Sequence, residues 1–148
     1  MGNKDIVREM EFLYKGFRCV IYFLIAGHRC GYVSIPQGHR YYRKNYDDIP
    51  NDVHGGLTYS ENFLPGEEFD GSWWVGFDCA QFCDKPDIET FERYIKAGLQ
   101  EIPDFIPEDM LRTEMKFRAQ NPDAEVRDMD FVYNELKDFV DNYLIEEE

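Results

Sequence analysis

The hydrophobic pattern of this 148-residue chain changes period near residue 85, and that change constrains the fold more than any other feature. Before it, apolar and polar residues alternate in short runs that are bounded by glycine and proline, a pattern typical of strands. After it, apolar residues recur every three or four positions, a pattern typical of amphipathic helices. Strands followed by helices predict an α+β fold, with the helices packed on an antiparallel sheet.

About five runs in the first half are predicted to form the sheet. Lys15 and Gly16 separate the first two strands, and the second of these, residues 17–25, is rich in β-branched and aromatic side chains. Glycine- and proline-rich turns bound three further runs. These are predicted at residues 29–35, 55–63 and 72–80.

Three helices are predicted in the second half. Asp87 is a candidate N-cap for a helix that extends to Leu99, and residues 111–120 are expected to form a short helix. Asp128 is the candidate cap of the last helix, in which apolar side chains repeat from Met129 to Leu144. Because 148 residues with 43% hydrophobic side chains can build one core, we expect a single domain over residues 1–148.

The net charge of −14 is distributed unevenly along the chain. Residues 1–44 carry eight lysines or arginines and three acidic residues, whereas the rest carries eight basic and twenty-seven acidic residues. Duplex nucleic acid is therefore not an expected partner of the acidic part. A small anionic ligand is expected to bind near the basic part.

The sequence predicts a cytoplasmic protein without a membrane partner. The first residues carry charges throughout, and the longest apolar run, residues 19–27, is too short to cross a bilayer. The cysteines are then expected to be reduced thiols. Their spacing does not favour a four-cysteine zinc site, and no metal or other cofactor is expected. The four are Cys19, Cys30, Cys79 and Cys83.

The sequence His54-Gly55-Gly56 allows two interpretations. The glycines let a ligand approach the backbone closely, with His54 as a hydrogen-bond donor, base or metal ligand. Alternatively, the glycines supply a turn with positive φ and the histidine faces solvent. Asp78 lies at the end of the run that contains Trp73 and is the candidate partner of His54, as an acid–base or metal-binding pair.

Aromatic and cationic residues supply a second group of candidates. Trp73 and Trp74 are expected to point to opposite faces of a strand, so that one ring is available for stacking unless another element covers it. The loop of residues 38–46 mixes arginine and lysine with tyrosine, which suits recognition of a phosphate and a base. A solvated loop is the alternative. The chain has no phosphate-binding glycine loop and no H-E-x-x-H or G-x-S-x-G motif.

The two motifs together resemble a group of small uncharacterised proteins from phages, prophages and bacterial mobile elements. The resemblance rests on H-G-G-L-T-[YF]-S at residues 54–60 and W-W-x-G-F-D-C-A at residues 73–80, in this order. It extends over about residues 14–84 and, more loosely, the last helix. The group commonly continues with His-x-Gly-Asp, whereas this chain has Gln-Phe-Cys-Asp at residues 81–84, which counts against a histidine-rich metal centre.

The resemblance implies an anti-defence protein of the sponge type, which evades immunity by sequestering a nucleotide-type immune signal without cleaving it. The setting would be the cytoplasm of an infected bacterium, and a homodimer or higher homo-oligomer is compatible with the sequence. Two alternatives are a nucleotide hydrolase or phosphodiesterase that uses His54 and Asp78, and an acidic protein that mimics nucleic acid. The candidate ligand-binding residues are Arg40, Tyr41, Tyr42, Arg43, His54, Gly55, Gly56, Thr58, Ser60, Trp73, Trp74 and Asp78.

Overall fold

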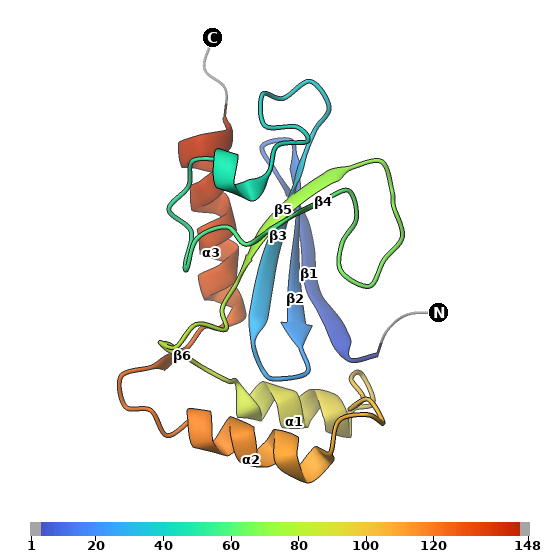
Figure 1. The fold of residues 1–148 in the computed structure, drawn as a ribbon, viewed down its shortest axis with the longest axis vertical. Helices are drawn as coiled ribbons and strands as arrows, with labels where there is room; N and C mark the ends of the chain where they lie inside the picture. The colour runs from blue at the N-terminus through green and yellow to red at the C-terminus, as the bar shows by residue number, and fades with distance from the viewer. Residues whose placement is uncertain (1–3, 146–148) are drawn as a thin grey trace.

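The computed structural model describes residues 4–145 and has the predicted α+β architecture (Figure 1). Five antiparallel strands form one sheet in the order β1-β2-β3-β5-β4. The strand β4 is much shorter than the predicted 55–63, because Gly55 and Gly56 have φ values of 72° and 80°, which an extended strand does not accommodate. The strands are β1 (Ile6–Tyr14), β2 (Phe17–Leu24), β3 (Arg29–Ile35), β4 (Tyr59–Glu61) and β5 (Trp73–Asp78).

Three α-helices follow the sheet in the sequence. They are α1 (Ile88–Lys96), α2 (Glu108–Arg118) and α3 (Met129–Phe139), and α3 continues as the π-helix η2 (Val140–Leu144). The helix α2 begins three residues earlier than predicted, because Pro107, with a φ of −63°, occupies the position before its first turn. A short 3-10 helix, η1 (Tyr46–Asp48), precedes β4. No helix among residues 4–145 is long and apolar enough to cross a membrane.

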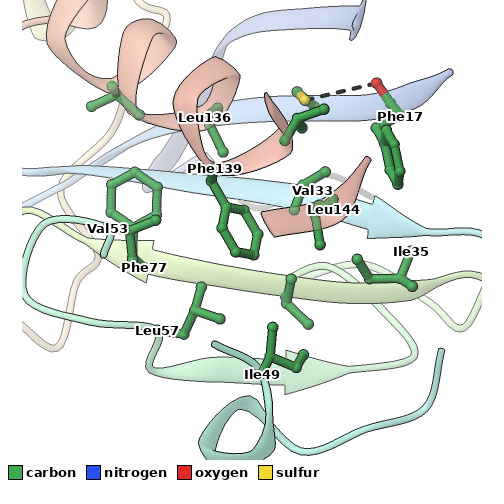
Figure 2. Close-up of a cluster of buried hydrophobic side chains, with 14 of the residues drawn as sticks. Phe17, Val33, Ile35, Ile49, Val53, Leu57, Phe77, Leu136, Phe139 and Leu144 are labelled. Atoms are coloured by element: carbon green, nitrogen blue, oxygen red, sulfur yellow. Dashed lines mark hydrogen bonds between the residues drawn. The ribbon is translucent and has the colours of Figure 1, made fainter. Parts of the chain in front are cut away.

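The main core lies between α3 and one face of the sheet (Figure 1). Phe139 and Leu144 contribute from the helical side, and Val33 and Phe77 from the strands (Figure 2). The helices α1 and α2 lie across the end of the sheet at which β2 connects to β3 (Figure 1). Phe23, Phe91 and Met115 form a separate buried cluster there. Thus α3 covers one face of the sheet, α1 and α2 cover one end, and no described helix covers the other face.

Strand alternation distributes the cysteines and tryptophans over both faces of the sheet. Cys19 belongs to the cluster under α3, whereas Cys30 belongs to a cluster on the opposite face. The sheet thus separates these two thiols, and all four cysteines are free. Trp73 packs against the first cluster and Trp74 is buried in the second, so the two rings lie on opposite faces as expected.

A two-stranded parallel sheet, which the sequence does not predict, connects the two halves of the chain. The strand β6 (Asp84–Lys85) follows β5, and β7 (Glu125–Val126) precedes α3. Asp84 pairs with Glu125 in this ladder. Each strand has only two residues and therefore carries no readable alternation. The pair places the residues after β5 beside the residues that lead into α3.

Asp87 caps α1 as predicted, and it also links the helix to the sheet. Its carboxylate accepts hydrogen bonds from the Thr90 N–H at 3.0 Å and from Arg29 Nη1 at 2.9 Å. Burial by itself raises the pKa of Asp87, but the bonds from Thr90 and Arg29 outweigh it and hold the pKa below its ordinary value of 3.8. The charged form is therefore favoured more strongly in the folded state than in the unfolded state.

We expect the Asp87 carboxylate to make stability depend on acid pH. Because its folded pKa is depressed, its contribution is complete above about pH 4 and is lost as the pH falls through the folded value. The variant Asp87→Asn keeps a side chain that can cap the helix but has no charge to titrate. Urea unfolding should show the wild type more stable than the variant at pH 7, with the two curves converging below pH 4. A constant difference between them over this range would contradict the expectation.

Candidate functional site

Asp84 is the centre of a polar cluster that joins three segments of the chain. It is only 2% exposed, yet His54 Nε2 lies 2.9 Å from both of its carboxylate oxygens. Arg127 Nε donates to Oδ1 at 2.9 Å, and the Gln81 N–H donates to Oδ2 at 2.9 Å. Cys83 Sγ lies 3.9 Å from Oδ1. A histidine, an arginine and a thiol therefore converge on one buried carboxylate.

The fold fixes each member of this cluster from a different element. The β6–β7 ladder brings Asp84 close to Arg127, which lies just after β7. Glu135 on α3 accepts the His54 backbone N–H at 2.8 Å. The His54 ring also packs edge-on against Phe131 of α3, with 5.3 Å between ring centroids. The histidine is thus held from its backbone and from its ring.

The glycines after His54 now have a structural explanation. Gly55 has a φ of 72°, and a Cβ atom there would lie 2.9 Å from the Gln81 side-chain nitrogen. Gln81 is the residue whose N–H binds Asp84. Gly55 therefore lets the Gln81 side chain pass close to the His54 loop, and Gly56 contributes the second positive φ of the turn.

The charges of the cluster are balanced within it. Burial by itself raises the pKa of Asp84, but hydrogen bonds from Arg127, His54 and the Gln81 N–H outweigh it and lower the pKa. The hydrogen bond to Asp84 in turn raises the pKa of Arg127. A hydrogen bond with Cys83 raises it further. Asp84 is therefore an ionised carboxylate whose charge is neutralised locally.

A cavity of about 500 Å³ opens beside this cluster, and Asp84 contributes to its wall. Two phenyl rings line it, Phe82 with 83% and Phe117 with 71% of the residue exposed. Arg118 lines it as well and is half-buried. Two exposed rings beside one cavity form an apolar patch, which indicates a binding site more strongly than a single exposed ring does. The remaining lining residues are Gln120 and Asn121.

Arg118 differs from most arginines of the chain in its electrostatic environment. Within residues 4–145, five others form ion pairs and Arg118 forms none. Its charge acts on the nearby buried His28. Burial is the main cause that lowers the pKa of His28, and the positive charge of Arg118 is the second cause. Arg118 thus presents an unneutralised cation to the cavity. The five paired arginines are Arg8, Arg18, Arg29, Arg112 and Arg127.

A second hollow, of about 570 Å³, lies on the sheet face that α3 does not cover. Thr58 and Asp78 line it, and Thr58 Oγ1 donates to Asp78 Oδ2 at 3.3 Å. Tyr32 and Tyr59 contribute their rings, which pack edge to face with 5.2 Å between centroids. Its lining includes an aspartate and no lysine or arginine. This hollow suits an uncharged ligand better than an anion.

The structure does not assemble the predicted site residues in one place. Among the described residues no hydrogen bond joins His54 to Asp78: His54 bonds Asp84, whereas Asp78 bonds Thr58, the Ala80 N–H and Gln81. The imidazole lies on the α3 side of the sheet, and the Asp78 side chain belongs to the opposite face. The expected His54–Asp78 pair is therefore replaced by a His54–Asp84 pair.

The basic loop lies at the end of the sheet where β3 finishes, away from α1 and α2 (Figure 1). Arg40 stacks over the Tyr41 ring at 4.9 Å, and Tyr41 and Tyr42 pack partly against the main core. Arg43 is exposed, with a positive φ of 63°. This loop has cations and rings, as predicted, but none of its residues lines the cavity beside Asp84 or the hollow that contains Thr58.

The remaining predicted residues have structural partners. Ser60 Oγ accepts the Tyr46 N–H at 3.1 Å, and Trp73 Nε1 donates to the Lys44 carbonyl at 2.9 Å. Trp74 is fully buried, so its ring cannot stack on a ligand. Ser60 and Trp73 therefore hold the segment before β4 against the sheet.

The residues that sequence reasoning missed are those of α2 and of the segment before α3. Phe117 and Arg118 occur in a helix whose apolar pattern is weak, and no motif marks them. Arg127 is 43 positions from Asp84 in the sequence. Asp84 itself follows the W-W-x-G-F-D-C-A motif closely, and this proximity was the one available signal.

Comparison with protein-family models, with curated proteins and with solved structures gave no significant match, so the site is interpreted from its own geometry.

Proposed function

We propose that this protein binds a small nucleotide-type ligand in the cavity beside Asp84 and holds it without cleaving it. The observation that carries the proposal is that Arg118, which has no ion pair within residues 4–145, lines the same cavity as the exposed rings of Phe82 and Phe117. A ligand that joins an aromatic ring to an anion would satisfy both features at once. Nucleotides have this composition.

The chemistry of the cavity wall agrees with such a ligand. Phe82 and Phe117 offer apolar faces for a base, and a guanidinium binds phosphate through charge-assisted hydrogen bonds. The exposed Gln120 carboxamide can donate to and accept from a base edge. Asp84 does not repel the phosphate strongly, because the Arg127 guanidinium pairs with it.

The resemblance to phage proteins supports a biological setting for this binding. In that setting the ligand is a nucleotide signal of a bacterial defence system, and the protein acts as a sponge in the cytoplasm of the infected cell. Retention rather than cleavage is supported by the cavity lining, which among the described residues contains no serine, threonine, cysteine, lysine or histidine.

We expect Arg118→Gln to weaken nucleotide binding by at least about tenfold, since a hydrogen bond to a charged group contributes about 1.5–3 kcal/mol. Titration calorimetry with a panel of mononucleotides, cyclic dinucleotides and ADP-ribose measures this. Arg43→Gln is the matched control, because it removes the same charge from the distant basic loop. If Arg43→Gln weakens binding and Arg118→Gln does not, the ligand occupies the basic loop and the proposed cavity is wrong.

Phe117→Ala tests the stacking surface in the same assay, with Phe105→Ala as control. Phe105 is also highly exposed but does not line the cavity. Chromatography of the ligand recovered after heating then separates the functions. An intact nucleotide supports sequestration, whereas a changed product that depends on His54 indicates a hydrolase. Absence of binding to any nucleotide, together with salt-sensitive capture of a host protein, indicates the acidic mimic.

A further inference from the structure

The cluster at the cavity wall contains three different metal-ligating side chains. One ligand atom each from His54, Cys83 and Asp84 lies within 4.8 Å of the other two. Imidazole, thiolate and carboxylate are the groups that bind zinc in proteins. His54 and Cys83 are half-buried, and Asp84 is buried. His54 lies in a loop, Asp84 is the first residue of β6, and Cys83 directly precedes it.

The spacing of these atoms is close to what a tetrahedral ion needs. Zinc bonds of about 2.0–2.3 Å imply separations of about 3.3 Å between nitrogen and oxygen and about 3.6 Å between sulfur and oxygen. Here His54 Nε2 is 2.9 Å and Cys83 Sγ is 3.9 Å from Asp84 Oδ1. The His54 and Cys83 ligand atoms lie within 4.8 Å of each other, so closing the site requires a rotation of these two side chains of at most about 1 Å.

The surroundings of the three groups also favour a metal. The Gln81 N–H and Arg127 hold the Asp84 carboxylate in place, as outer hydrogen bonds commonly do for metal ligands. Arg127 is also a hydrogen-bond partner of Cys83, so it contacts two of the three ligands. Binding requires the thiol to release its proton to solvent and the imidazole to carry its hydrogen on Nδ1.

From this geometry we infer that His54, Cys83 and Asp84 form a binding site for a single Zn²⁺-type ion, with the fourth coordination position open to the adjacent cavity. A mixed sulfur, nitrogen and oxygen donor set selects a borderline ion over magnesium or calcium. Three protein ligands with one open position are typical of zinc sites that take up water or a ligand. The site does not depend on nucleotide binding, because its three ligands belong to the protein.

Cobalt titration of the reduced, metal-free protein tests this site, because a tetrahedral cobalt–thiolate centre has visible bands and a charge-transfer band that oxygen ligands alone do not produce. We expect one Co²⁺ per chain, displaced by Zn²⁺. Cys83→Ser should abolish the thiolate band and weaken binding by at least about tenfold. His54→Gln should also weaken cobalt binding. Asp78→Asn is the control, because Asp78 lines the other hollow, and it should leave cobalt binding unchanged.

A second measurement uses the unaltered chain and so does not depend on how the variants fold. Cys83 is the one cysteine that is not buried, so iodoacetamide should alkylate it first. Zn²⁺ should slow this alkylation at least about tenfold, as expected for a coordinated thiolate. An unchanged alkylation rate, a cobalt complex without a thiolate band, or a band that persists in Cys83→Ser would each overturn the inference.

Discussion

Replacing Arg29 by alanine is expected to lower the free energy of unfolding by about 3–5 kcal/mol, the range found when one partner of a buried ion pair is removed. Arg29 is 4% exposed at its side chain and Glu9 is 3% exposed. Arg29 Nε donates to Glu9 Oε1 at 2.6 Å and Nη2 donates to Oε2 at 3.1 Å. The truncation leaves the Glu9 carboxylate buried without its cation, which is the main cost.

Arg29 also connects β3 to α1 and to the segment before α3. Its Nη1 donates to Asp87, the cap of α1, and to the Arg127 carbonyl at 3.2 Å. Denaturant unfolding measured by far-UV circular dichroism gives the loss. Arg112→Ala is the matched control, because it breaks a surface pair with Glu92 and should cost no more than about 1 kcal/mol. Equal losses for the two variants would show that burial of the Arg29 network contributes nothing.

Replacing Trp74 by alanine is expected to cost about 3–5 kcal/mol, as for other large aromatic side chains removed from a core. The side chain is fully buried in the cluster on the face without a helix, next to Tyr22 and Leu64. The Arg18 guanidinium lies 5.1 Å from its ring. Its removal leaves a cavity under the segment that covers this face, and the surrounding strands cannot close it fully.

The neighbouring Trp73→Ala provides the comparison. Trp73 is half-buried and packs at the margin of the main core, so its truncation should cost clearly less than that of Trp74. Chemical denaturation of both variants, followed by circular dichroism because each substitution removes a fluorophore, measures the difference. Trp74→Phe should leave nucleotide affinity unchanged. A strong loss of affinity in this conservative variant would place Trp74 in a binding site, as the sequence first indicated.

The elements that the sequence predicts well are those whose side chains repeat. Residues 29–35 form β3 with the predicted bounds, because this run contains Tyr32, Val33 and Ile35 and glycine-containing turns end it on both sides. The α3 prediction is confirmed for the same reason, and Asp128 caps it by accepting the Phe131 N–H at 2.9 Å. Repeating patterns record which face of an element is buried, and burial determines most of the fold.

The candidate site is hard to predict because it depends on contacts between distant segments. His54 lies 30 positions from Asp84, and Arg127 lies 43 positions from it. The two-residue strands that bring these side chains together have no period to detect. The order of residues did identify His54 as unusual, but it could not choose between Asp78 and Asp84 as the partner, since both follow the same strand closely.

The ladder between β6 and β7 has a consequence for how a ligand could enter. Asp84 pairs with Glu125, so the intervening segment, which contains α1 and α2, leaves the body of the molecule and returns to it at one point. This segment can open as a cooperative unit, with the sheet and α3 still folded, only when Phe91 and Met115 separate from Phe23 and the Arg29–Asp87 pair breaks. Arg118 belongs to this unit and Asp84 lies at its base. The rate at which the helical pair opens, visible as hydrogen exchange of its amides, would then set how quickly the cavity fills and empties.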